Sequence, residues 1–555
     1  MSASSKKKLR REQNAAQLTE KQLQEQKEAS KLKKQTLVFT VVIALILVAS
    51  IITIAVTGIG STGVFERNTK AITIGEHTLT AAELNYFYTD VVYEQYNEWS
   101  NTYGEYMTLL LQWNEGLDLS KPFDQQIRPG TEQNWGEFFA DVAVDEAKNT
   151  YALYDHAVAN GVTLTEEEQT DIEETLETME LEATLLRGFS DLGEYLKAMY
   201  GRGASVDSFR EYLKVVTLAQ NYFSNNYDAL TYEDADLRER EAENFGKYSN
   251  FTYTYFHVSP SVFLECTDPE NKEHTHTAEE NAAALKAAEE AANELVKSGA
   301  KDEDLLNMAI KRLDAYKSNE NAKAVHSEHV SYQNITEPVA EWLAEEGRKE
   351  GDIGIVPNEI TTTAADGTKT TEVQGYFIVI FQGTEDNNVN PIDVRHILVT
   401  IKNGKTDEDG KTVYSDEDKA EALKKIEEIK AEFEAGEQTE DAFSILAKKK
   451  SEDTGSTGNG GLYENVYPHM MVEAFNDWCF DADRKTGDVE IVETEYGYHL
   501  MYFVQTHDYT YRDYQIDLEL RAEDSEAWFN SITEPKEYKV HDLSRLNTDM
   551  VLATN

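Results

Sequence analysis

The sequence predicts an α+β protein with an N-terminal transmembrane helix, a mainly helical domain and two tandem antiparallel-sheet modules with flanking helices. Three observations lead to this prediction. Residues 37–58 contain no charged side chain. Helical patterns with N-capping signals recur from residue 81 to residue 225. After residue 250, one order of strands and helices occurs twice.

The charge of the chain divides it into a basic head and an acidic body. The formal net charge is −51. Residues 1–35 hold ten Lys or Arg against four Glu, a net of +6, so the rest carries −51 − 6 = −57. Because so acidic a surface repels phosphates, nucleic acid is excluded as a partner. Residues 1–35 are expected to form a cytoplasmic tail.

Residues 36–60 are predicted to cross a membrane once as a helix, since the apolar run is long enough to span a bilayer core. Lys31, Lys33 and Lys34 directly precede the run, which places the N-terminus in the cytoplasm and the bulk of the chain outside the cell membrane. A cleaved signal peptide is the alternative. The apolar run is longer than a usual signal h-region, and no small-x-small cleavage site is evident.

Residues 66–249 are predicted to form the helical domain. It begins with a hairpin around Gly75 and Glu76, after which Thr80 and Glu83 have the spacing of a capping box. The aromatic residues between 81 and 99 would either line a groove for unfolded chains or fill a helical core, and the core is favoured. The predicted helices cover residues 81–99, 135–160, 165–187, 192–200 and 206–225.

Residues 250–385 and 390–506 repeat one pattern. Trp342 starts Trp-Leu-Ala-Glu-Glu-Gly-Arg-Lys-Glu-Gly-Asp, and Trp478 starts Trp-Cys-Phe-Asp-Ala-Asp-Arg-Lys-Thr-Gly-Asp. Trp, Arg-Lys and Gly-Asp fall at the same spacing in both segments, and each continues to a strand that starts with Gly-Tyr. The two segments are therefore expected to be two copies of one domain.

The copies differ in their polar residues. The second has His396 in its opening strand and His499 in its closing strand, where the first has Tyr255 and Phe377. The second also contains Ser-Glu-Asp, ending at Asp453, and a Gly-Gly-Leu turn, and the first contains neither. If the two imidazoles lie on one face of neighbouring strands, they can hydrogen-bond and fix each other's tautomers.

This strand–helix–turn–strand order, with a histidine on both outer strands, resembles the parvulin family of peptidyl-prolyl cis/trans isomerases. The resemblance implies that His396, Asp453 and His499 are the catalytic residues. It also implies four substrate-binding residues, of which three correspond to the apolar proline pocket and the last to a threonine near the second histidine: Leu462, Met471, Phe475 and Thr494. Met470 is an alternative to Met471, because the spacing from the Gly-Gly-Leu turn is one residue longer than usual.

The resemblance further implies a membrane-anchored extracytoplasmic foldase of Gram-positive type. Its partners would be unfolded secreted polypeptides with X-Pro bonds, and residues 250–385 would be a catalytically silent module. By the same resemblance, residues 508–545 of the C-terminal segment 507–555 would return to complete the helical domain. The rival hypothesis is a non-catalytic holdase or adaptor. The enzyme is favoured because the three polar residues occur together in one copy and are missing from the other.

The predicted reaction requires neither a cofactor nor a metal. A prolyl isomerase needs only to lower a rotational barrier of about 18–20 kcal/mol around a partly double bond. His274 and His276 stand in a polar loop and give only a weak metal signal. The two cysteines, Cys266 and Cys479, have no spacing that demands a disulfide.

Overall fold

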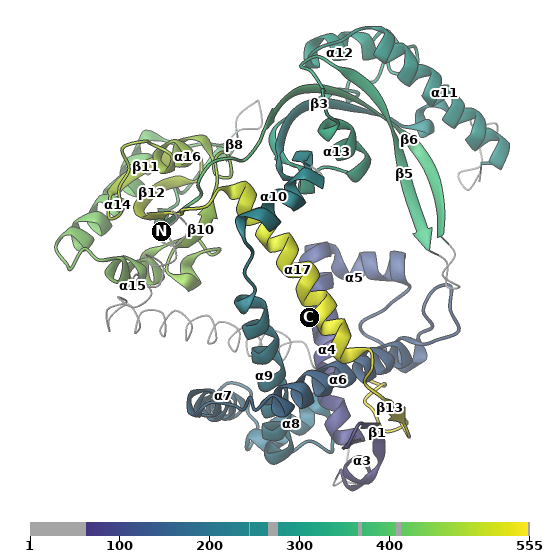
Figure 1. The fold of residues 1–555 in the computed structure, drawn as a ribbon, viewed down its shortest axis with the longest axis vertical. Helices are drawn as coiled ribbons and strands as arrows, with labels where there is room; N and C mark the ends of the chain where they lie inside the picture. The colour runs from purple at the N-terminus through teal and green to yellow at the C-terminus, as the bar shows by residue number, and fades with distance from the viewer. Residues whose placement is uncertain (1–62, 244, 265–275, 364–368, 407–411, 553–555) are drawn as a thin grey trace. The chain divides into compact units, whose positions relative to one another are not determined.

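The computed structural model describes residues 63–243, 245–264, 276–363, 369–406 and 412–552 (Figure 1). The predicted tail 1–35 and the predicted transmembrane helix 36–60 lie outside these ranges, as do Cys266 and His274. Within these ranges, no helix has both the length and the apolar character needed to cross a bilayer. The chain divides into two compact units, one formed by residues up to 230 and from 521 onward, the other by residues 231–520.

The first unit is mainly helical and contains one small antiparallel sheet of order β13-β1-β2. Ile72, in the central strand, pairs with Leu79 on one side and with Val540 on the other. The last strand of the chain therefore completes a sheet whose other strands come from the start of the unit. The elements are β1 (Lys70–Ile74), β2 (His77–Thr80), β13 (Tyr538–Val540), α3 (Val64–Asn68), α4 (Ala81–Tyr103), α5 (Met107–Leu110), α6 (Trp135–Ala159), α7 (Glu166–Leu185), α8 (Leu192–Tyr200), α9 (Val206–Ala229) and the short helical turns η1 (Gly104–Tyr106), η2 (Leu111–Glu115) and η3 (Phe123–Gln125).

Reciprocal side-chain caps begin α4, α6 and α7. At α4 the hydroxyl of Thr80 accepts from the backbone N–H of Glu83 at 3.3 Å, and the Glu83 carboxylate accepts from the backbone N–H of Thr80 at 2.7 Å. Each such cap contributes about 1 kcal/mol, because it satisfies backbone donors that the first helical turn leaves unpaired. The predicted hairpin and capping box are confirmed.

The aromatic side chains of α4 fill the core of this unit. Tyr86, which is fully buried, packs its ring 5.1 Å from that of Tyr200 and 5.2 Å from that of Phe209. Edge-on and tilted contacts of this kind add to the free energy gained from burial. Buried with Tyr86 are the other large rings of the helix, namely Phe87, Tyr88, Tyr93, Tyr96 and Trp99. The core alternative is therefore correct for these residues.

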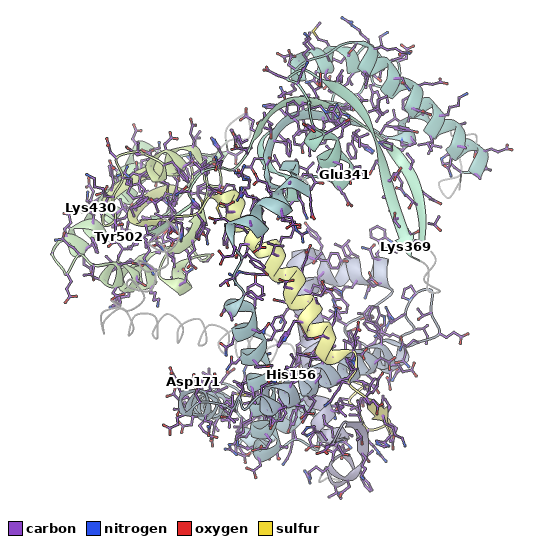
Figure 2. All side chains as sticks on the ribbon, in the orientation of Figure 1. His156, Asp171, Glu341, Lys369, Lys430 and Tyr502 are labelled. Carbon is purple, nitrogen blue, oxygen red and sulfur yellow. The ribbon has the colours of Figure 1, made fainter. Side chains whose placement is uncertain are left out.

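The second half of α17 (Tyr511–Thr533) belongs to the first unit. The ring of Trp528 lies 5.5 Å from that of Tyr222 and 6.1 Å from that of Phe223 on α9. His156 of α6, which is labelled in Figure 2, accepts or donates a 2.9 Å hydrogen bond with the Tyr222 hydroxyl. The chain thus re-enters this unit through an aromatic contact with α6 and α9.

The second unit contains two four-stranded antiparallel sheets with the same topology. Their strand orders are β4-β3-β6-β5 and β10-β7-β12-β11, which is 2-1-4-3 in chain order for both. The first sheet belongs to β3 (Asn250–Val258), α11 (Ala278–Lys297), α12 (Glu303–Ile310), β4 (Val325–Ser331), α13 (Glu337–Ala344), β5 (Ile353–Thr363) and β6 (Lys369–Glu385). The second belongs to β7 (Ile392–Val399), α14 (Asp416–Glu434), α15 (Glu440–Lys450), β10 (Leu462–Val466), α16 (Glu473–Cys479), β11 (Val489–Thr494) and β12 (Gly497–Thr506).

Helices cover both faces of each sheet. One face of the first sheet packs on α11 and α12, and the other packs on α13. The second sheet is covered in the same way by α14 and α15 on one face and α16 on the other. The predicted α+β class with antiparallel sheets is confirmed. The remaining elements are α10 (Asp234–Glu243), the hairpin β8 (Lys405–Thr406) with β9 (Thr412–Val413), and the turns η4 (Phe245–Tyr248), η5 (Pro260–Phe263), η6 (Tyr332–Asn334) and η7 (Thr457–Asn459).

The repeated Trp-to-Arg spacing has the same local structure in both copies. The guanidinium of Arg348 lies 3.7 Å from the ring centre of Trp342, and its Nε donates to the Trp342 carbonyl at 3.1 Å. Arg484 lies 4.1 Å from the ring centre of Trp478 and donates to its carbonyl at 3.0 Å. In both copies, this spacing lets one arginine stack on the indole and donate to the carbonyl of the same tryptophan.

Candidate active site

Two neighbouring strands place His396 and His499 on one face of the second sheet. In the β7–β12 register, His396 pairs with Met501, and His499 lies two residues before Met501. Side chains two residues apart on a strand point to the same face, so the two rings meet diagonally. Their Nδ1 atoms are 2.9 Å apart, and the rings are 3% and 5% exposed.

Four side chains form one hydrogen-bonded chain across this face. The His499 Nε2 lies 2.8 Å from the Thr494 hydroxyl, and the His396 Nε2 lies 2.8 Å from Oδ2 of Asp453. Since a carboxylate only accepts, Nε2–H of His396 donates to Asp453. The hydrogen bonds that link Thr494, His499, His396 and Asp453 therefore fix the orientation of both imidazole rings.

Burial, followed by the neighbouring His396, lowers the pKa of His499 to about 3. His499 is accordingly neutral at physiological pH. A neutral imidazole carries one ring proton, so one of its two nitrogens donates a hydrogen bond and the other accepts one. The hydrogen bond from His396, followed by those from the Ser456 hydroxyl and the Gly455 backbone, holds the pKa of Asp453 well below its usual range. The Asp453 end of this series of hydrogen bonds therefore carries a stable negative charge.

The turn after α15 holds Asp453 in place. The hydroxyl of Ser451 accepts from the backbone N–H of Leu398 in β7 at 3.1 Å and from that of Asp453 at 3.2 Å. The Ser456 hydroxyl donates to Asp453 Oδ2, and the backbone N–H of Gly455 donates to Oδ1 at 3.1 Å. Ser451 thus braces the turn against the strand that carries His396.

Apolar side chains border the histidine pair on the α16 side. Phe475 is 3% exposed and stands edge-on to both rings, with centroids 5.6 Å from His396 and 5.5 Å from His499. Met471 is half-buried and packs against the same apolar cluster. Met470 is 44% exposed. Of the two methionines considered, Met471 is the one that packs against the apolar cluster to which Phe475 belongs.

Tyr463, not Leu462, lies against the histidine pair. In the β10–β7 register, Leu462 pairs with Arg395 and Tyr463 pairs with Val394, which shares the face of His396. The Tyr463 ring is 5.2 Å from that of His396, and its hydroxyl donates to Asp453 at 3.1 Å. The expectation that Leu462 borders the site is therefore wrong by one residue. Neighbouring residues of a strand point to opposite faces, so Tyr463 takes the place beside the histidines.

The Gly460-Gly461 turn positions this part of β10. Gly461 has φ +75°, and a Cβ there would lie 2.1 Å from the carbonyl oxygen of His396. The backbone N–H of His396 donates to the Gly461 carbonyl at 2.8 Å. Only glycine allows so close an approach at this φ.

The same region matches a family model. Residues 376–506 match the PPIC-type PPIASE domain. By this likeness we call the second module, residues 390–506, the PPIC-type domain. The match includes all four strands of the second sheet and begins in β6 of the first. It therefore contains the whole group of polar side chains described above.

Known relatives resemble only part of the chain. The foldase protein PrsA of Geobacillus kaustophilus is 39% identical over 79 residues, which are 14% of this chain and 26% of that protein. Foldase protein PrsA 1 of Listeria monocytogenes serotype 4b is 33% identical over 114 residues, 20% of this chain and 30% of that protein. The chain thus spans about a quarter to a third of the length of these relatives. The crystal structure of PrsA from Bacillus subtilis aligns at 14% identity and a TM-score of 0.23, over 74% of this chain and 91% of that one.

The first module differs from the PPIC-type domain at the two histidine positions. In the β3–β6 register Tyr255 pairs with Val379, as His396 pairs with Met501 in the second sheet. Phe377 then takes the place of His499, and its ring lies 6.2 Å from that of Tyr255. Two phenyl rings in edge-on contact replace the hydrogen-bonded imidazoles.

The sequence interpretation missed two members of the PPIC-type site, Ser456 and Tyr463. Ser456 donates to Asp453 and lies 3.1 Å from His396 Nε2. Its position three residues after Asp453 is a common spacing for a side chain that closes a turn, and this was an available signal. Tyr463 could be recognised only after the register of β10 with β7 was known.

Proposed function

We propose that the PPIC-type domain, residues 390–506, catalyses cis/trans isomerisation of X-Pro bonds, with His396, Asp453 and His499 as its catalytic group. The observation that carries this proposal is the buried chain of hydrogen bonds from Thr494 to Asp453 beside Phe475. It combines a fixed polar group with an apolar border, which is what the reaction needs.

The chemistry follows from the electronic structure of the amide. A planar amide is polar because the nitrogen lone pair is delocalised onto the carbonyl oxygen, and twisting the bond removes this delocalisation. An apolar environment therefore disfavours the planar forms more than the twisted one. A catalyst gains by binding the twisted form more tightly than either planar form.

We assign different tasks to the members of the group. The two imidazoles are almost fully buried, whereas the Asp453 side chain is 18% exposed. In this proposal Asp453 and the Tyr463 hydroxyl face the substrate, and the histidines hold and polarise Asp453. Met471 and Phe475 would contact the proline ring. Thr494 acts on His499 by fixing the orientation of its ring.

We also propose that the protein is a foldase for secreted polypeptides, anchored by residues 36–60 with its N-terminus in the cytoplasm of a Gram-positive bacterium. The support is the charge-free run after Lys31, Lys33 and Lys34. The partial likeness to proteins named foldase adds to it. The helical residues 66–249, with the returning C-terminal segment, would then act as the chaperone domain.

The first module, residues 250–385, is proposed to bind polypeptide without catalysis. Tyr255 and Phe377 offer no ring nitrogen at the two histidine positions. The rival function extends this role to the second module, so that both modules only hold extended chains. The two hypotheses differ in a single measurable property, the rate of prolyl isomerisation.

The test is a refolding assay whose slow phase is limited by prolyl isomerisation, run with the full-length protein and with Asp453→Ala. We expect the wild type to accelerate the slow phase and Asp453→Ala to lose most of the acceleration. Asp441→Ala, an exposed carboxylate in the same domain, is the matched control and should accelerate like the wild type. If the wild type suppresses aggregation without changing the slow rate, the isomerase proposal is wrong and the holdase takes its place.

A further inference from the structure

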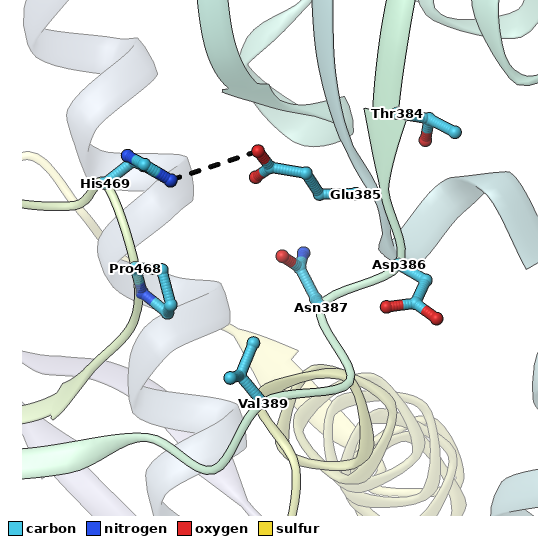
Figure 3. A pocket seen from close by; sticks show the side chains of 7 residues that line it. All are labelled: Thr384, Glu385, Asp386, Asn387, Val389, Pro468 and His469. Carbon is cyan, nitrogen blue, oxygen red and sulfur yellow. Dashed lines mark ion pairs between the residues drawn. The ribbon is translucent and has the colours of Figure 1, made fainter. Parts of the chain in front are cut away.

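A second group, of two imidazoles and one carboxylate, is made of residues other than those of the PPIC-type site. His329 is in β4, Glu385 is the last residue of β6, and His469 is in the loop between β10 and α16. One ligand atom from each of the three lies within 4.8 Å of the others. The His329 Nδ1 is 2.6 Å from Glu385 Oε1, and the His469 Nε2 is 3.9 Å from the same oxygen. Figure 3 shows Glu385 and His469 facing each other across a hollow.

A bulge turns His329 toward this position. The β3–β4 register shifts between Phe251 and Tyr253, so residues 328 and 329 have no paired partner in β3. Bulges redirect side chains in this way. His329 has φ 55°, and its backbone N–H donates to the Thr252 hydroxyl at 3.3 Å. Because Glu385 pairs with Asn250 at the end of β6, both side chains reach the same end of the sheet.

The loop brings His469 to the same place. His469 also has a positive φ, 66°, and its backbone N–H donates to the Asn476 side chain at 2.7 Å. Its ring stacks on that of His329 with centroids 3.5 Å apart and planes 6° from parallel. Non-glycine residues rarely adopt this backbone conformation, so neighbouring contacts must hold both histidines there.

The surroundings are rich in negative charge. Glu385 and Asp386 both line the hollow. Glu328 is the neighbour of His329 in β4, and its Oε1 lies 3.0 Å from the Nε2 of His326. A cation bound between the two imidazoles would therefore lie close to several carboxylates.

We propose that His329, Glu385 and His469 bind a divalent transition-metal ion of the zinc type. Two imidazoles and one carboxylate form a ligand set that Zn²⁺ accepts, with water or a further carboxylate in the remaining position. An alkaline-earth ion is disfavoured, because Ca²⁺ and Mg²⁺ bind oxygen ligands.

The geometry requires small movements. In a tetrahedral site with bonds of about 2.1 Å, ligand atoms are separated by about 3.4 Å. The present separations from Glu385 Oε1 are 2.6 and 3.9 Å, so each changes by less than about 1 Å. The lone pairs of two parallel rings cannot both point at one ion, so one ring must also turn. The His469 side chain is 42% exposed and has room for this rotation.

The three proposed ligands are more accessible to a metal ion than the two histidines of the PPIC-type site. At the PPIC-type site, each ring nitrogen of His396 and His499 already has a hydrogen-bond partner, and both rings are buried. The second group includes an exposed ring at the edge of a hollow. A bound ion would also stabilise the fold, because it would bind the native arrangement and not the unfolded chain.

The experiment is a titration of the metal-stripped full-length protein with Zn²⁺ alone, in competition with a chromogenic chelator. We expect one equivalent to bind with micromolar or tighter affinity, and excess Mg²⁺ or Ca²⁺ not to displace it. His329→Ala, His469→Ala and Glu385→Gln should each weaken binding at least tenfold. His326→Ala, a histidine on the same strand outside the group, is the matched control and should bind like the wild type.

Two further readouts separate a specific site from loose binding to the acidic surface. X-ray absorption at the zinc edge should report two imidazole ligands, and circular dichroism should show that Glu385→Gln keeps the wild-type fold. The proposal is overturned if no equivalent binds at micromolar concentration or if the three substitutions leave the affinity unchanged. It is also overturned if His396→Ala abolishes binding while the three substitutions do not.

Discussion

Replacing His499 with phenylalanine tests the electrostatics of the PPIC-type site. The first module already carries Phe377 at this position in a sheet of the same topology, so the larger ring is compatible with the fold. The substitution removes the only ring in the site whose pKa is lowered to about 3. The stability of the second module should consequently depend less on pH in the variant than in the wild type.

The sign and size follow from linkage. In the unfolded chain His499 titrates near pH 6.5, so between pH 6.5 and 3 the unfolded state binds a proton that the folded state excludes. The contribution of His499 is therefore complete above about pH 6.5 and is lost as the pH falls. At pH 5 the loss is about 1.5 × 1.36, or about 2 kcal/mol. The low pKa of Asp453 acts only below about pH 4, its unfolded value, and does not enter this window.

The assay is urea unfolding at pH 7.5 and pH 5, followed by pulsed hydrogen exchange in peptides from residues 390–506. Thr494→Val is a useful companion, because it removes a contact of the same ring and leaves the imidazole in place. The wild type and Thr494→Val should lose about 2 kcal/mol more than His499→Phe on acidification. If the wild type and His499→Phe lose the same amount, the buried neutral state of His499 is not what links this module to pH.

Three other predictions concern backbone geometry, thiol reactivity and the returning C-terminal segment. Gly461→Ala should destabilise the PPIC-type domain by about 3 kcal/mol or more in urea unfolding, because its Cβ would meet the His396 carbonyl at 2.1 Å; Gly458→Ala, with nothing within 4 Å, should change stability little, and equal effects would contradict this account. Cys479 is 2% exposed and burial raises its pKa to about 12, so a thiol reagent should label it only after urea unfolding; rapid labelling of Cys479 in the native protein, located by peptide mapping, would show that α16 is packed differently. Lys536→Met should increase hydrogen exchange in β1 and lower the stability of the first unit by about 1 kcal/mol, because Asp155 then keeps only its contact with His77. Unchanged exchange would show that the ion pair of Lys536 with Asp155 does not hold the C-terminal segment.

Much of the fold and of the site could be predicted, because the residues that identify them are close together in the sequence or are set apart by comparison of the two copies. The capping boxes require only two residues three positions apart, as at Thr80 and Glu83. The repeated Trp342 and Trp478 spacings identified two copies, and comparison of the copies singled out His396 and His499. The roles of these histidines and of Asp453 in catalysis stay predictions.

The rest depends on register and on distant residues. Val325–Ser331 forms β4, yet its two His and one Glu hide any alternation of apolar side chains. The sequence predicts Leu462 at the place that Tyr463 takes, because a sequence does not state which residue faces which side of a strand. The group of His329 and His469 joins residues 140 positions apart, as 469 − 329 gives, and no local pattern relates them.

Because β13 pairs with β1, the sheet of the first unit cannot be completed until the C-terminal part of the chain has been synthesised. Ile74 and Tyr538 are register partners, and 538 − 74 = 464 residues separate them. At about 5–20 residues per second, the ribosome needs about 23–93 seconds to make that interval. During this time β1 has an open edge, which is the type of surface that pairs with other chains. Residues 231–520 are contiguous and complete before β13 exists, so synthesis itself allows the two sheet modules to fold while the helical unit still waits for its third strand.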